Sequence, residues 1–266
     1  MYGDKLGVNM HIMTAAAGVM RNLEACIHRC HLDIDSFAIA PYASGLACLV
    51  EDEMDLGSIC IDMGGGTTTI SVFFDNQVMF VDSIPVGGNH VTKDIARGLS
   101  APLAYAERMK NLYGSAIPTP SDDQEMIRIP IVGEEDSETN QVPRSMLVGI
   151  VRPRIEEIFE LVRSKLNQAG FEKLAGRRVV LTGGASQLTG VTNLATTMLD
   201  KQVRVGRPTN IKGLAESANG PAFSVCAGLV QFTFNKRSNP ALPIAKPLEF
   251  PGSRFGRLGQ WLRDNI

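Results

Sequence analysis

The residues best suited to chemistry form one short run, Asp62-Met63-Gly64-Gly65-Gly66-Thr67-Thr68-Thr69. Glycines lack a Cβ atom and permit φ > 0, so successive amide N–H groups can point into one concavity and bind an anion. Threonine hydroxyls add donors, and Asp62 supplies a carboxylate where a phosphate-bound divalent cation would lie. A tight hairpin turn fits the same residues, since a lone glycine loop is a weak indication of function.

A second run of the same kind, Leu181-Thr182-Gly183-Gly184-Ala185-Ser186, also follows a β-like segment. Two such loops suggest two walls of one nucleotide cleft, and the alternative is two unrelated turns. Between them, Glu107 and Lys110 are at i and i+3 of an expected helix, so they share a face and could bracket a purine or ribose. For this spacing alone, a surface ion pair is the commoner outcome.

The elements that must position these residues alternate between strands and helices, as in an α/β fold. Strands are expected at 37–40, 58–62, 69–74, 78–84, 126–132, 178–181 and 203–205. Helices are expected at 14–31, 41–50, 89–99, 102–112, 145–169 and 221–230, with one more ending near Leu199. The acidic run 51–55 is expected to be a solvated connector and 134–140 a loop tip.

Composition excludes several classes of protein. The chain has 266 residues, 44% hydrophobic and 20% charged, which suits one or two well-cored domains. A net charge of −2 indicates no nucleic-acid partner, and the absence of a long apolar run predicts no membrane-spanning helix. The five cysteines are an odd count, which favours a reducing compartment. Cys26 and Cys30 are one turn apart but lack a distant pair that would complete a metal site.

The C-terminal part changes character. Residues 235–252 are rich in proline and predict an extended linker, whereas 253–266 regain helical spacing. The apolar side chains of this last segment cluster within an arc of about 140°, and they are Phe255, Leu258, Trp261, Leu262 and Ile266. Arg257 and Arg263 lie outside the arc and Arg254 on its flank. A short basic amphipathic helix fits in-plane membrane binding, and the alternative is docking on its own domain.

Three motifs together resemble the actin/DnaK/sugar-kinase ATPase superfamily. Ile61–Thr68 resembles its second phosphate loop, Glu107–Lys110 the adenine-contacting Glu-x-x-Lys of the MreB and DnaK branches, and Leu181–Ser186 the adenosine loop. Within the superfamily the chain is similar, over essentially its whole length, to the FtsA family of bacterial cell-division proteins. That resemblance extends to Asp82–Thr92 and Val203–Pro208.

The resemblance implies that the chain binds ATP and Mg²⁺. The nucleotide-binding residues that it implies are Asp62, Gly64, Gly65, Gly66, Thr67, Thr68, Glu107, Lys110, Gly183, Gly184, Ala185 and Ser186. Gly65, Gly66 and Thr67 would donate to the β- and γ-phosphates, and Asp62 would hold the Mg²⁺ through water. The helical Glu/Lys pair would contact the adenosine, and the backbone of the second loop would face the adenine and α-phosphate.

Two departures from the superfamily pattern bear on activity. The other phosphate loop of these proteins, in an N-terminal strand pair, has no counterpart at the start of this chain, so the chain resembles an N-terminally truncated FtsA. Faster-hydrolysing relatives place a glutamate before the proline of the first connecting helix, where it orients the attacking water. The residue here is Ala40, before Pro41. We therefore expect at most very weak ATPase activity and assign no catalytic residue.

The implied architecture is an actin-like (ribonuclease-H-like) ATPase fold of the α/β class with an incomplete first half. The expected parts are a remnant of the first half (1–56), a second-half core (57–100 and 176–234), a small subdomain (101–175), a linker (235–252) and an amphipathic membrane-targeting helix (253–266).

The function implied by the resemblance is cell division. The chain would polymerise and tether the FtsZ ring to the cytoplasmic face of the inner membrane at the septum. Its partners would be FtsZ, further copies of itself, other division proteins and the anionic membrane surface, with no nucleic acid. The alternatives are a phosphotransferase or chaperone-type ATPase with the same core, and a pilus-assembly adaptor. Neither alternative has a use for an amphipathic tail, so the C-terminus discriminates both of them from the division protein.

Overall fold

The computed structural model describes residues 7, 11–130, 132, 139–171, 176–209, 211 and 213–238. It divides into two units, of which the first comprises Met1–His11 with Ile39–Arg237 and the second Ile12–Ala38 with Ser238–Ile266. The predicted membrane-targeting helix 253–266 and the predicted linker after Ser238 lie outside the described residues.

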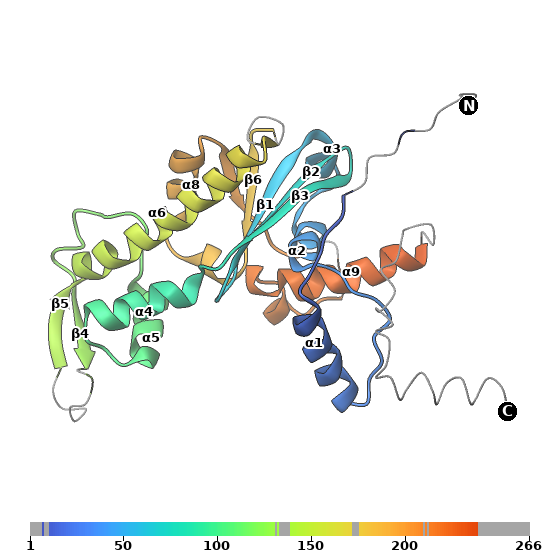
Figure 1. Cartoon of the computed structure of the whole chain (residues 1–266). Coiled ribbons are helices and arrows are strands. Elements are labelled where there is room, and N and C mark those ends of the chain that lie inside the picture. The colour runs from blue at the N-terminus through green and yellow to red at the C-terminus, as the bar shows by residue number, and fades with distance from the viewer. Residues whose placement is uncertain are drawn as a thin grey trace. The chain divides into compact units, whose positions relative to one another are not determined.

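The first unit is built on a five-stranded mixed sheet with the order β3-β2-β1-β6-β7 (Figure 1). Its strands are β1 (Ser58–Met63), β2 (Thr68–Phe74), β3 (Gln77–Ile84), β6 (Arg178–Thr182) and β7 (Gln202–Val205). β1 is antiparallel to β2 and parallel to β6, β2 is antiparallel to β3, and β6 is parallel to β7. This mixed sheet with helical connections confirms the predicted α/β class.

Helices and one hairpin complete the first unit. The helices are α2 (Ala40–Cys48), α3 (Glu51–Leu56), α4 (Gly88–Gly98), α5 (Leu103–Tyr113), α6 (Arg144–Gln168), α8 (Val191–Leu199) and α9 (Ser224–Ser238). The hairpin pairs β4 (Met126–Pro130) with β5 (Thr139–Pro143). Short 3₁₀ turns occur at Gly184–Gln187, Glu216–Ala218 and Pro221–Phe223. Among the described residues, no helix combines the length and apolar character that a membrane crossing requires.

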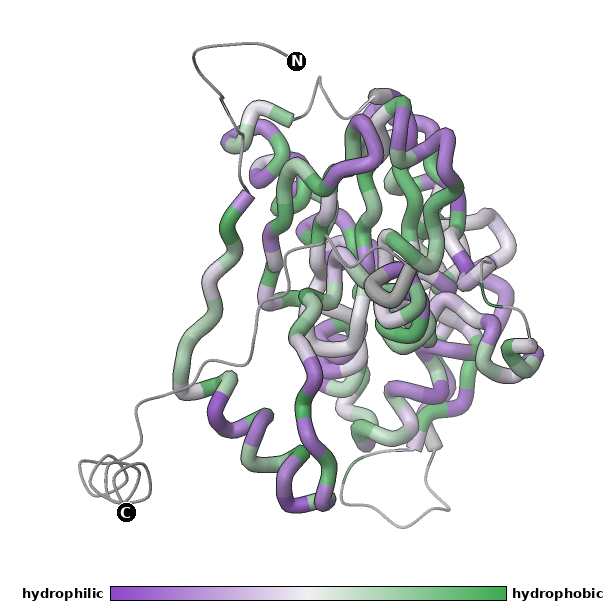
Figure 2. Tube along the Cα trace, turned by 90° about the vertical axis from the view of Figure 1, so that its right-hand side faces the viewer, coloured by the Kyte–Doolittle hydropathy of each residue, from purple (hydrophilic) through white to green (hydrophobic). Residues whose placement is uncertain are grey.

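The core of the first unit follows from the alternation of side chains along β1. Ile59, Ile61 and Met63 belong to one buried cluster and Cys60 to another, because successive strand residues point to opposite faces of a sheet. α6 adds its apolar face to the larger cluster, with Leu147, Val151, Ile155, Ile158, Phe159, Val162 and Leu166 almost fully buried. Figure 2 shows hydrophobic residues running along the sheet strands. The helix predicted at 145–169 is confirmed as α6.

The second unit contains one described helix, α1 (Ala17–Arg29). The helix predicted at 14–31 is therefore confirmed, with slightly shorter bounds. None of its residues is buried, and Val19 and Leu23 are 67% and 49% exposed.

The acidic run 51–55 is not the solvated connector that we predicted. It forms α3, and Glu53 is only 3% exposed. Its carboxylate accepts hydrogen bonds from the Nε of Arg204 at 2.8 Å, the Nη1 of Arg178 at 3.4 Å and the backbone N–H of Val50 at 3.2 Å. Sequence spacing cannot show this, because both arginines come from strands more than 120 residues away, β6 and β7.

Three boundaries also differ from prediction. No strand forms at 37–40, since the chain passes directly into α2 at Ala40. Residues 139–140, expected in a loop tip, begin β5 and pair with β4. The helix expected to end near Val230 continues to Ser238, so 235–238 are helical rather than linker. Segments as short as 37–40, polar strands such as β5 and the ends of helices all carry weak local signals, which is why these errors fall there.

Candidate functional site

The two glycine loops meet at one edge of the sheet. β1 and β6 are parallel neighbours, and Asp62 pairs in register with Thr182, so both strands end side by side. Gly183 has φ +84°, and a Cβ atom there would overlap the Oδ1 of Asp62 and lie 2.5 Å from the carbonyl oxygen of Met63. The absence of a side chain at Gly183 therefore lets the second loop close onto the end of β1.

A cavity of about 470 Å³ opens where the loops meet. Of the predicted site residues, it is lined by Gly64, Gly65, Glu107, Lys110, Gly184 and Ala185. Its other lining residues were not predicted, and they are Gly88, Asn89, Val91, Asn111, Gly114, Ile155, Gln187, Leu188 and Thr189. The structure thus brings both loops and the Glu/Lys pair to one hollow.

Six predicted residues lie outside the lining, namely Asp62, Gly66, Thr67, Thr68, Gly183 and Ser186. Asp62 and Gly183 are buried where the two loops meet. Thr68 and Ser186 are buried and hold the loops together, since Thr68 Oγ1 donates to the carbonyl of Val86 at 2.8 Å and Ser186 Oγ to that of Gly183 at 2.7 Å. Gly66 and Thr67 are exposed at the hairpin tip. The tip is closed by the amide of Gly64, which donates to the carbonyl of Thr67 at 2.9 Å.

The first residues of α4, Gly88 and Asn89, line the cavity. The amide of Gly88 donates to the Gly64 carbonyl at 2.9 Å, and that of Asn89 to the Gly65 carbonyl at 2.8 Å. A Cβ atom at Gly88 would lie 3.2 Å from the Cβ of Ala185 and 3.7 Å from the Nζ of Lys110. Gly88 thus lies where both loops and α5 converge. The available signal was the Gly87-Gly88 pair at the expected start of a helix.

Lys110 lines the cavity and is mostly buried, so its ion pair with Glu107 is not simply a surface pair. Its ammonium donates to Glu107 Oε2 at 2.7 Å, to Thr92 Oγ1 at 2.9 Å and to the carbonyl of Gly88 at 3.3 Å. The Lys110 side chain is 12% exposed and that of Glu107 45%. Burial raises the pKa of Glu107, but the hydrogen bonds from Lys110 and Thr92 outweigh it and hold that pKa below its ordinary value. The Glu107 carboxylate is therefore ionised at neutral pH.

Asp62 lies at the end of β1, 8% exposed. Burial raises the pKa of its carboxyl to about 6, and a hydrogen bond with Ser44 opposes that rise in part. A nearby cation would relieve the cost of the buried charge. Within the described residues, no three His, Cys, Asp or Glu side chains gather as a metal site. A cation here would keep mainly water and phosphate ligands, which suits Mg²⁺.

Known proteins of similar structure share this fold. MreB5 of Spiroplasma citri bound to ADP matches with a TM-score of 0.67 at 16% identity, covering 84% of this chain and 68% of that one. The double helical filament of MamK matches with a TM-score of 0.58 at 17% identity, covering 83% and 66%. At such identities the likeness shows the fold alone, and that fold is actin-like.

Sequence comparison shows the family. A family model described as "Cell division protein FtsA" matches residues 59–228. The cell division protein FtsA of Rhizobium meliloti (strain 1021) is 46% identical over 269 residues, covering 100% of this chain. The chain spans 61% of that relative's length. On the strength of both matches, this chain belongs to the FtsA family of cell division proteins.

Proposed function

We propose that the cavity binds ATP with Mg²⁺ and that the chain is an actin-like division protein that polymerises and links FtsZ to the membrane. The observation that carries the nucleotide proposal is the convergence of two glycine loops and the Glu107–Lys110 pair on one 470 Å³ cavity. Support comes from the similar MreB5 structure bound to ADP and, for polymerisation, from the MamK filament.

The residues of the cavity suit a nucleotide chemically. Gly64 and Gly65 leave backbone exposed to a phosphate, since a side chain there would fill the space. Gly66 and Thr67 at the exposed tip would add donors to the phosphates. Asp62 would hold Mg²⁺ through water, and the Mg²⁺ would neutralise part of the negative charge of the phosphates. Of the predicted set, Thr68 and Ser186 would act by shaping the loops rather than by contact.

Adenosine recognition would come from the other walls. Glu107 and Lys110 present a hydrogen-bonded pair from α5, so they could hydrogen bond to a ribose or purine edge. Gly184 and Ala185, with Gly183 behind them, would face the adenine and α-phosphate. Hydrolysis would be slow, because the position before Pro41 is Ala40, which has no carboxylate to orient water.

The wider proposal concerns the subdomains and the C-terminal segment. We assign 57–100 with 176–234 to a core subdomain and 101–175 to a small subdomain that would contact FtsZ. The amphipathic helix predicted at 253–266, after the predicted proline-rich linker, would bind the inner membrane surface at the septum. One short helix anchors weakly, so polymerisation would strengthen attachment by avidity.

Asp62→Asn tests the nucleotide proposal with two readouts. The folded-state pKa of about 6 exceeds the ordinary value of 3.8, so the ionised carboxylate costs stability above pH 6 and little near pH 4. Urea unfolding should show the variant more stable by up to about 3 kcal/mol at pH 7.5 and nearly unchanged at pH 4. Titration with a fluorescent ATP analogue should show Mg²⁺ tightening binding about tenfold in wild type but not in the variant.

Asp75→Asn is the matched control. Asp75 is exposed in the β2–β3 turn at φ +52°, a conformation that asparagine tolerates, so neither readout should change. Equal enhancement by Mg²⁺ in wild type and Asp62→Asn would remove Asp62 from the site. No binding of the ATP analogue by wild type would overturn the nucleotide proposal.

Membrane attachment is tested by pelleting the chain with vesicles that contain about one third anionic lipid. The wild-type chain should pellet and carry FtsZ with it, and salt should weaken the effect because each basic residue contributes about 1 kcal/mol near an anionic surface. Trp261→Glu should remain in the supernatant, whereas Trp261→Phe should pellet nearly as wild type. Pelleting unaffected by the glutamate would contradict the anchor.

A further inference from the structure

The stretch between α5 and β4, residues 114–125, forms one rim of the cavity through Gly114. Its first residues are fastened to the side of the second loop. The amide of Ala116 donates to the carbonyl of Thr189 at 2.8 Å, and a Cβ atom on Gly114 would lie 2.9 Å from the Cδ1 of Leu188. A shift of this stretch would therefore move the cavity wall directly.

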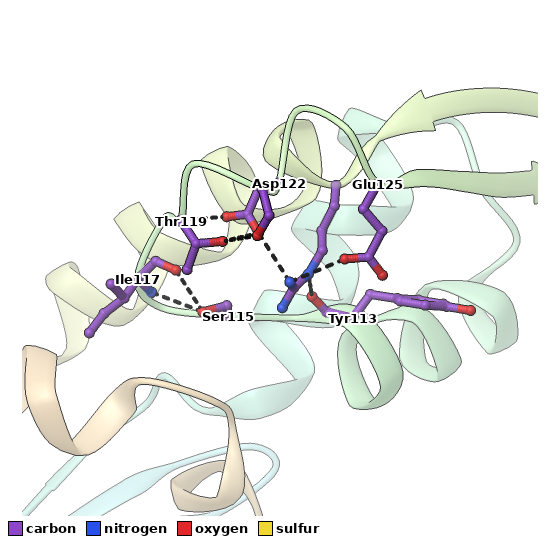
Figure 3. Close-up of polar contacts among 8 residues, drawn as sticks. Tyr113, Ser115, Ile117, Thr119, Asp122 and Glu125 are labelled. Atoms are coloured by element: carbon purple, nitrogen blue, oxygen red, sulfur yellow. Dashed lines mark hydrogen bonds and ion pairs between the residues drawn. The ribbon is translucent and has the colours of Figure 1, made fainter.

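A hydroxyl closes the first turn of the stretch (Figure 3). Ser115 Oγ donates to the carbonyl of Ile117 at 2.7 Å and accepts from the Ile117 amide at 3.1 Å. Ile117 in turn packs on Gly190, where a Cβ atom would lie 3.0 Å from its side chain. The turn therefore packs directly against residues 189–190.

Arg144, the first residue of α6, holds both ends of the stretch. Its Nε donates to the carbonyl of Tyr113 at 2.8 Å, and its Nη1 to Asp122 Oδ1 at 3.0 Å and to Glu125 Oε2 at 3.3 Å. Tyr113 ends α5, so this carbonyl has no partner within the helix, and a cation is favourable there.

Asp122 is the buried partner of this guanidinium, with a side chain 2% exposed. It accepts from the Thr119 amide and the Thr119 hydroxyl, both at 2.7 Å (Figure 3). The Thr119 amide, with the Thr119 hydroxyl and the charge of Arg144, holds the pKa of Asp122 below its ordinary value against the effect of burial. The ion pair is therefore charged and hydrogen bonded on both sides at neutral pH.

We propose that Arg144 is a positioning residue for the nucleotide cavity. It does not line the cavity, but by gripping Tyr113 and Asp122 it fixes the C-terminal end of α5 and the Gly114 rim against Leu188 and Thr189. α5 also carries Glu107 and Lys110, so the contacts of Arg144 with the end of α5 also position these two side chains. The inference rests on the proposed nucleotide function and adds a residue that determines affinity without touching the ligand.

The experiment compares dissociation constants of a fluorescent ATP analogue for four full-length chains, at a temperature where circular dichroism shows each one folded. Arg144→Gln should bind at least about tenfold more weakly, because a neutral amide cannot span both partners. Arg144→Lys should have an intermediate affinity, since an ammonium keeps the positive charge but cannot reach the Tyr113 carbonyl and the Asp122 carboxylate together as the guanidinium does. Arg152→Gln is the control, since Arg152 lies on the same helix and, in the part of the chain that the structure describes, forms its ion pair with Glu156, at 2.7 Å.

A merely structural role predicts a lower melting temperature with unchanged affinity of the folded chain. Equal affinities for wild type and folded Arg144→Gln would overturn the inference while leaving the proposed function intact. If Arg144→Gln does not fold, the test rests on Arg144→Lys. Weaker binding of the ATP analogue by Arg144→Lys would support the inference, and affinity equal to that of wild type would overturn it. Loss of affinity in Arg152→Gln equal to that in Arg144→Gln would also overturn it. No binding by wild type would overturn the proposed function and the inference with it.

Discussion

Gly183→Ala is expected to abolish nucleotide binding and to destabilise the chain by at least about 3 kcal/mol. Gly183 has φ +84° and ψ 164°, a region that residues with a Cβ atom essentially do not occupy. The added methyl group would also collide with the Asp62 carboxylate and lie 2.5 Å from the Met63 carbonyl oxygen. Because both neighbours belong to the buried strand β1, relief would require the two loops to separate.

Gly184→Ala, one residue further on, is the matched control for stability alone, because Gly184 itself lines the cavity. Its φ is not in the positive region, and a Cβ atom there would meet only the Cβ of Ala222, at an ordinary 3.9 Å. Urea unfolding should separate the stabilities of the two variants, and titration with the fluorescent ATP analogue should compare Gly183→Ala with wild type. Comparable stability and affinity for Gly183→Ala and wild type would show that the loops do not depend on this contact.

Arg204→Met is expected to destabilise the first unit by about 3 kcal/mol at pH 7, because it leaves the Glu53 carboxylate buried without its main partner. Burial raises the pKa of Glu53, but the hydrogen bond and charge of Arg204 hold it below the ordinary 4.5. A lowered acid pKa contributes stability above pH 4.5 that is lost as the pH falls through the folded value. The difference between variant and wild type should therefore narrow in acid, as measured by urea unfolding at pH 7 and pH 4.

Arg178→Met is the control for this prediction. Arg178 also faces Glu53, but only at 3.4 Å and with a side chain 61% exposed, so its loss should cost less than about 1 kcal/mol. Equal losses from the two variants would mean that charge alone, and not the buried geometry of Arg204, stabilises Glu53. Arg204 also donates to the Cys48 carbonyl at 2.8 Å, so it joins α2 and α3 to β7.

Local sequence patterns predicted the regular elements of the first unit well. Short apolar runs located β1, β2 and β6, and the helical period of apolar residues located the buried face of α6. These elements bury large apolar areas, so pattern and tertiary structure agree. β5 was missed because Thr139–Asn140 have no apolar pattern and owe their strand conformation to pairing with β4.

By itself, the sequence determined the family, the α/β class and the two glycine loops that end β1 and β6, because these depend on residue type and short spacing. The tertiary structure alone decided which other groups join them. Gly88 and Thr189 reach the cavity because separate segments pack there, and Lys110 gains Thr92 and Gly88 as partners across α4 and α5. Glu53 and Arg144 acquire their roles in the same way. Contacts between distant segments depend on packing, which no local spacing encodes.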